Sequence, residues 1–210
     1  IPGKHYATGY RDTGDAVDGG RLSFPPLAAG GLGTPAALLD WLRQLALAFQ
    51  RSEGCGGISH GTAVMMLTPG EDLGSGAFMR SCMGLGVFVF EVPTESGGAS
   101  KWMLHQAAND GFRGLYLVCF DGPDASNGPR GFVILCNGDN QGMFLNCAVA
   151  RALLVSPLAF SPPVQGLDWS AVPSMDGGFS TAGIKQEEVV NLGLKSLVLE
   201  AFVGAASVAS

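Results

Sequence analysis

The chain has 210 residues, of which 47% are hydrophobic and only 14% are charged, and its net charge is −6. Globular proteins hold about 25% charged residues on average, so this composition predicts a core that is large for its surface or a surface that protein partners cover. Nucleic-acid binding through a basic patch is excluded, because 12 Lys and Arg residues face 18 Asp and Glu residues. No apolar run reaches the roughly 18 residues of a membrane-spanning helix.

Five cysteines occur, and no two of them have the Cys-x-x-Cys spacing. The odd number argues against a closed disulfide framework, and the spacing argues against a structural zinc site. Free thiols favour a reducing compartment. We therefore expect neither a metal nor another cofactor. The sequence begins at Ile1 rather than at Met, which indicates a processed product, a fragment or an incomplete chain.

The N-terminal residues 1–33 are rich in Gly and Pro and predict an irregular segment. A helix is then predicted, with Thr34 as its N-cap, Pro35 as its first residue and an end near Arg51. Apolar residues recur along it at helical spacing, namely Leu38, Leu42, Leu45 and Phe49. The pattern of residues 58–67 is open between a short helix and a loop.

Four strands are predicted in the middle of the chain. Residues 83–92 form the first, and their glycines indicate the close approach of a neighbour. The apolar runs 102–104 and 112–120 flank the turn signal Asn109-Asp110-Gly111, which predicts a hairpin with His105 at the end of its first strand. Residues 131–137 form the fourth strand. Short connections between strands predict an antiparallel sheet with helices packed on it, the α+β class.

The C-terminal third begins with a predicted helix over residues 140–155, for which Asp139-Asn140-Gln141 is a cap rather than a metal-ligand set. This helix closes a first unit, residues 1–155. Residues 156–183 have little periodicity and predict an extended linker. Residues 184–203 carry an amphipathic stripe, so the last part, 184–210, is expected to hold a helix that docks onto a neighbour.

Three stretches in order resemble the motifs of one enzyme family. Residues 28–32, Ala-Ala-Gly-Gly-Leu before a helix, are similar to its Ala-Gly-Gly-Leu-x-Ser/Thr segment, and residues 83–87 to its Tyr-Gly-Leu-Gly-Trp strand. Residues 105–113 are similar to His-Gly-Gly-x-Asn-x-Gly-Phe-Arg, the histidine version of the Lys-Thr-Gly motif. The family is that of the serine β-lactamases and penicillin-binding proteins: class C β-lactamases, DD-peptidases, related esterases and mitochondrial β-lactamase-like proteases.

The resemblance covers about residues 5–155 and implies the C-terminal portion of a β-lactamase/transpeptidase-like fold, incomplete because the family's N-terminal strands and helix are missing. It further implies that His105 faces the cleft and that the Ala108 N–H is an oxyanion donor. Gln106, Ala107 and Asn109 would contact substrate. Two of these positions depart from the pattern. Gln106 stands where the family has Thr or Gly, and Ala107 stands where a glycine leaves room for substrate.

The family's other two motifs are absent from the sequence. A Ser-x-x-Lys supplies the nucleophile and the base that activates it. The residues three positions before the lysines are Ile1, Gly98, Ala182 and Leu192, and none is serine. No Tyr-x-Asn occurs either. In the family both motifs precede the Ala-Gly-Gly-Leu segment.

Three functional hypotheses follow. The first is a catalytically inactive β-lactamase-like protein that serves as a structural subunit of a larger, mitochondrial protein assembly. The second is the C-terminal part of an active serine hydrolase of the esterase, peptidase or β-lactamase type, whose nucleophile lies outside this chain. The third is a ligand-binding module that uses the former cleft without turnover.

The other candidate residues have plainer interpretations. A His105 satisfied by hydrogen bonds is the alternative to a catalytic one. His60 in Ser59-His60-Gly61 is expected in a helix cap or a loop, since no third member of a triad is evident. His5 has no recognisable metal partners. The glycines of residues 30–33 lack the Gly-Lys-Ser/Thr ending of a phosphate-binding loop.

Overall fold

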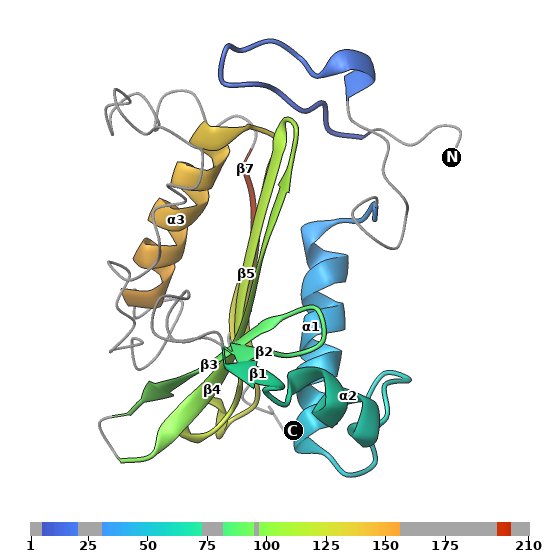
Figure 1. Ribbon diagram of the computed structural model, residues 1–210, viewed down its shortest axis with the longest axis vertical. Helices are drawn as coiled ribbons and strands as arrows, with labels where there is room; N and C mark the ends of the chain where they lie inside the picture. Colours follow the sequence, from blue (N-terminus) through green and yellow to red (C-terminus); the bar gives the residue numbers. More distant parts are fainter. Residues whose placement is uncertain (1–5, 21–30, 73–81, 95–96, 156–196, 203–210) are drawn as a thin grey trace, which may run out of the picture.

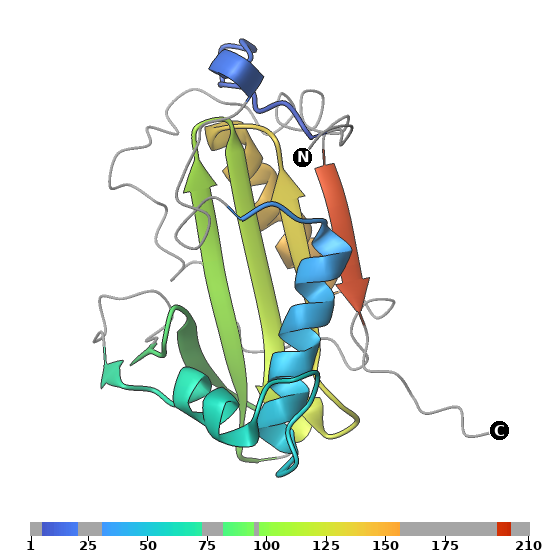
Figure 2. The same ribbon diagram turned by 90° about the vertical axis from the view of Figure 1, so that its right-hand side faces the viewer.

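The computed structural model describes residues 6–20, 31–72, 82–94, 97–155 and 197–202. They form an antiparallel β-sheet with helices on both faces (Figures 1 and 2), which confirms the predicted α+β class. The strands lie in the sheet in the order of the sequence, and each neighbouring pair is antiparallel. They are β1 (Glu71–Asp72), β2 (Cys82–Met83), β3 (Phe88–Pro93), β4 (Ala99–Asn109), β5 (Phe112–Asp121), β6 (Arg130–Cys136) and β7 (Leu197–Phe202).

Helices α1 and α2 cover one face of the sheet and α3 covers the other, as Figure 1 shows with the sheet nearly edge-on. The helical elements are η1 (Asp18–Gly20), α1 (Pro35–Gln50), α2 (His60–Leu67), η3 (Pro123–Ala125) and α3 (Asn140–Val155). Among the described residues no helix combines the length and the apolar character that crossing a membrane requires.

Helix α1 begins where the sequence predicts. The hydroxyl of Thr34 accepts a hydrogen bond from the Ala37 N–H at 3.1 Å, and Pro35 is the first helical residue. The same kind of N-cap shows that residues 58–67, which the sequence left open between a helix and a loop, contain a short helix. There the hydroxyl of Ser59 accepts from the Thr62 N–H at 3.0 Å and starts helix α2.

The core consists of two layers because side chains alternate between the faces of each strand. On β4, Trp102 and Leu104 pack toward α3, while Met103 packs toward α1 and α2. Strand β5 follows the same rule, with Leu117 on the α3 face and Val118 on the α1 face. Burying each such aliphatic side chain contributes about 1.5–3 kcal/mol, so both layers stabilise the position of β4.

The predicted hairpin is confirmed and is longer than its apolar runs suggest. β4 and β5 pair from Lys101↔Asp121 to Asn109↔Phe112, with His105 opposite Tyr116. The two residues between the strands include Gly111 with φ +76°, a conformation that favours glycine.

The predicted strand over residues 83–92 is wrong in its middle. The chain turns there, and the Gly84 N–H donates to the Val87 O at 2.9 Å, so β2 and β3 form two separate strands. Gly86 at φ +75° permits the turn. The expected close approach is confirmed at Gly84, where an added Cβ would lie 2.3 Å from the Met66 O.

The predicted C-terminal helix over residues 184–203 is wrong for Leu197–Phe202. These residues pair with β6 as strand β7, from Gly131↔Phe202 to Cys136↔Leu197. The sequence stripe reports only local periodicity, whereas the edge of β6 offers a row of main-chain hydrogen-bonding groups that a strand satisfies. The linker 156–183 and the rest of the predicted helix lie outside the described residues.

Candidate functional site

Strand β4 has a long partner on one side and a short one on the other. β5 accompanies it through Asn109, but β3 pairs only with residues 99–104. β3 begins at Phe88, opposite Leu104, because the chain turns at Gly84 and Gly86 just before it. Residues 105–108 therefore have no strand beside them on the β3 side within the described part of the chain. We call this stretch the outer edge of β4.

Four of the residues that the resemblance implies at the site, His105, Gln106, Ala107 and Ala108, form this stretch, and Asn109 follows it as the last residue of β4. Continuing the alternation from Met103, the side chains of His105 and Ala107 lie on the α1 face, and those of Gln106 and Ala108 lie on the α3 face. His105, Ala107 and Ala108 are exposed, and Gln106 and Asn109 are partly buried. The methyl group of Ala107 thus stands on the sheet face beside His105 and does not project from the strand edge.

His105 lies against Tyr116 of β5. The two ring centroids are 5.9 Å apart and the planes are inclined by 32°. Burial lowers the pKa of His105 below its ordinary 6.5, and burial raises the pKa of Tyr116 to about 12. His105 as a residue remains exposed, so its ring loses only part of its hydration. A neutral imidazole at pH 7 can both donate and accept a hydrogen bond, which a lysine ammonium cannot.

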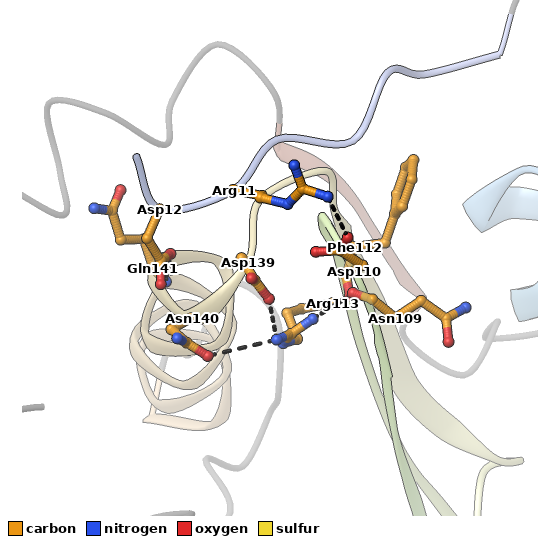
Figure 3. A network of polar contacts seen from close by, with 9 residues as sticks. All are labelled: Arg11, Asp12, Asn109, Asp110, Phe112, Arg113, Asp139, Asn140 and Gln141. Atoms are coloured by element: carbon orange, nitrogen blue, oxygen red, sulfur yellow. Dashed lines mark hydrogen bonds and ion pairs between the residues drawn. The ribbon is translucent and has the colours of Figure 1, made fainter. Parts of the chain in front are cut away.

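Arg113, the second residue of β5, is a buried arginine on the α3 face of the sheet, next to the end of β4 (Figure 3). The Arg113 side chain is only 5% exposed, and its Nη1 donates to the Asn109 O and, at 2.8 Å, to the Phe112 O. Its Nη2 forms an ion pair with Asp139 and lies 3.4 Å from the Asn140 Oδ1. One guanidinium therefore joins the end of β4, the start of β5 and the beginning of α3.

The N-terminal segment adds a second layer to this network. Arg11 Nη2 forms an ion pair with the Asp110 carboxylate at 2.9 Å (Figure 3). The Asp12 Oδ1 accepts from the Gln141 N–H at 3.0 Å. The sequence predicted that residues 139–141 cap α3, but this capping oxygen comes from a residue 129 positions away.

The carboxylates of this network influence one another. The pKa of Asp139 is raised, chiefly by burial, with smaller contributions from Asp12 and Asp110, while Arg113 lowers it. Two carboxylates of this group, Asp110 and Asp139, are paired with the guanidinium groups of Arg11 and Arg113 respectively. The loss of hydration raises the pKa of Asp139 by more than the ion pair with Arg113 lowers it.

The remaining candidates do not join the site. His60 is the first residue of α2, and its Nδ1 lies 3.0 Å from the Ala48 O, an arrangement that holds α2 against α1. No group of three or more His, Cys, Asp or Glu side chains is placed to bind a metal in the described ranges. His5 lies outside those ranges, as does the first residue of the glycine run 30–33.

Two features of the site escaped the sequence analysis. Tyr116 could have been found, since counting four residues along each strand from the pair Asn109↔Phe112 at the turn places it opposite His105. The Arg11–Asp110 ion pair spans 99 positions and had no local signal.

The chain was compared with protein-family models, with curated proteins and with solved structures, and no match was found in any of the three. The function is therefore inferred from the motifs and from the geometry of the outer edge of β4.

Proposed function

We propose that this chain is the C-terminal part of a β-lactamase-related serine hydrolase of the esterase, peptidase or β-lactamase type. In this proposal the outer edge of β4 borders the substrate site. One observation carries it: the exposed His105 lies on a stretch of β4 that β3 does not accompany. The order of the three family-like stretches in the sequence, residues 28–32, 83–87 and 105–113, supports the same assignment.

The chemistry of the proposal divides between this chain and a segment outside it. An extended acyl substrate could lie along residues 105–108 and receive main-chain hydrogen bonds, as peptides do at sheet edges. The Ala108 N–H would stabilise the oxyanion, and neutral His105 would exchange a proton or a hydrogen bond with the reacting groups. The nucleophilic Ser-x-x-Lys would come from elsewhere, since this sequence contains none.

A second candidate is the catalytically inactive structural subunit of a mitochondrial assembly. Gln106 and Ala107 favour it, because both are bulkier than the family pattern at these positions. The exposed methyl group of Ala107 occupies space beside His105 on the α1 face. A binding module without turnover would use the same edge, so both alternatives are outcomes of one experiment.

The native protein, purified with any companion chain, is treated with a fluorophosphonate probe and with a labelled penicillin, and labelled residues are located by mass spectrometry. The proposal predicts a labelled serine followed by x-x-Lys. It also predicts that His105→Ala lowers the labelling rate by about 100-fold, while the exposed α1 variant Arg43→Ala labels like the wild type. Absence of any labelled serine would reject the hydrolase. A penicillin that then still protects β4 from hydrogen exchange would indicate the binding module.

A further inference from the structure

Arg113 lies where three elements meet and is almost fully buried. Its donors reach the Asn109 O at the end of β4 and the Phe112 O at the start of β5. Its charge is balanced by Asp139 at the beginning of α3. A buried charge is tolerated only where it is paired and hydrogen-bonded, and this one is both. The position is therefore specific for a planar, forked cation.

Arg113 cannot itself touch a ligand at His105. Its side chain lies on the α3 face of β5, whereas His105 lies on the α1 face of β4. Its contact with the site runs through the main chain. The Asn109 carbonyl that it holds follows directly on residues 105–108, which lack the support of β3.

The hairpin turn is held from outside as well. Arg11 pairs with Asp110, and the small residue Gly9 lies so close that an added Cβ would be 2.5 Å from the Phe112 ring. Val17 of the same segment is buried, and its Cγ2 would lie 2.5 Å from a Cβ on Gly111. The N-terminal segment thus holds the turn that joins β4 to β5.

We propose that Arg113 is a positioning residue, which holds the outer edge of β4 in place for a ligand through the Asn109 carbonyl. The inference rests on the proposed function for what is bound, but the mechanical part can be tested without any ligand. Lysine at position 113 would keep the charge beside Asp139 but would lack the fork that reaches both carbonyls.

The test compares Arg113→Lys with Arg130→Lys. Arg130, the first residue of β6, is a matched control, because its side chain is 6% exposed and forms an ion pair with Asp124 at 2.6 Å. It lies away from residues 105–108. Hydrogen exchange of the native protein is followed by mass spectrometry. We expect Arg113→Lys to speed exchange of residues 105–109 by about tenfold. Arg130→Lys should leave that exchange unchanged even where it lowers Tm as much.

The second readout uses the concentration dependence of fluorophosphonate labelling. Arg113→Lys should raise the half-saturating probe concentration by about tenfold, with the limiting rate changed by less than about threefold. Equal effects of the two lysine variants on both readouts would overturn the positioning role and leave Arg113 a purely structural residue. Labelling absent from the wild type would reject the proposed function, while the exchange comparison would still decide the role of Arg113. If Arg113→Lys does not fold, Asp139→Asn, which removes the ion pair of Arg113, is compared with Asp124→Asn, which removes that of Arg130, and only Asp139→Asn should speed exchange of residues 105–109.

Discussion

Asn146 on α3 provides a sharp test of the α3–sheet interface. Its exposed fraction is 0%, and among the described residues neither its side-chain oxygen nor its nitrogen has a hydrogen-bond partner. Ala150, one turn further along the helix, belongs to the apolar layer between α3 and the sheet. The amide of Asn146 is thus held beside apolar groups and pays a desolvation cost that nothing compensates.

We expect Asn146→Leu to stabilise the protein. An unsatisfied buried amide costs about 1–3 kcal/mol, and leucine has a similar branched shape without polar atoms. Tighter packing can take back about 1 kcal/mol. The net expectation is a gain of about 0–2 kcal/mol, which corresponds to a rise in Tm of up to about 8 °C for a chain of this size.

The assay is urea unfolding followed by circular dichroism, with linear extrapolation to water. Asn137→Leu is the control, because Asn137 Nδ2 donates to the Thr8 O at 2.7 Å, although its buried Oδ1 has no partner among the described residues. Since that substitution also removes a hydrogen bond, it should leave the protein about 1 kcal/mol less stable than Asn146→Leu does. A loss of more than about 1 kcal/mol for Asn146→Leu would contradict this prediction, since it would mean that the amide forms hydrogen bonds in solution.

Two further predictions concern the strand and its turn. The NMR titration of His105 should give a pKa below 6.5 that moves back toward 6.5 in Tyr116→Ala. Because the native state binds this proton more weakly than the unfolded chain, the stability due to His105 is present above pH 6.5 and declines as the pH falls through the lowered pKa. His105→Gln should remove that decline, and an unchanged pH profile would contradict it. Gly111→Ala should lower the free energy of unfolding by about 2–4 kcal/mol, because φ is +76° and the Cβ would meet Val17 at 2.5 Å. Gly97→Ala is the control in the same unfolding assay, since φ is +87° but nothing lies within 4 Å of the added Cβ, and it should cost only about 1 kcal/mol. Equal losses in the two variants would argue against the contact with Val17.

The two candidate functions make opposite use of the same strand. A hydrolase needs the outer edge of β4 accessible to substrate, whereas a structural subunit could cover it with a neighbouring chain. The exposed side chains of His105 and Ala107 are compatible with either arrangement in the assembled protein. Covalent labelling decides between them because it requires a nucleophile within reach of this strand.

Local signals in the sequence determined much of this protein. The Thr34 and Pro35 pair predicted the start of α1, and the Asn109-Asp110-Gly111 turn predicted the β4–β5 hairpin with His105 on its first strand, although β4 continues past His105 to Asn109. These predictions succeeded because caps and tight turns depend on residues within four positions of each other. The α+β class followed from them.

Only the tertiary structure decided which edges of the sheet are paired. It turned Leu197–Phe202 into β7 and broke residues 83–92 at Gly84 and Gly86, so that β3 stops short of His105. It also brought Arg11 to Asp110 across 99 positions. The physical reason is that pairing and ion contacts between distant segments depend on how the whole chain packs, which no local periodicity reports. The outer edge of β4, on which the proposed function depends, is a consequence of that packing.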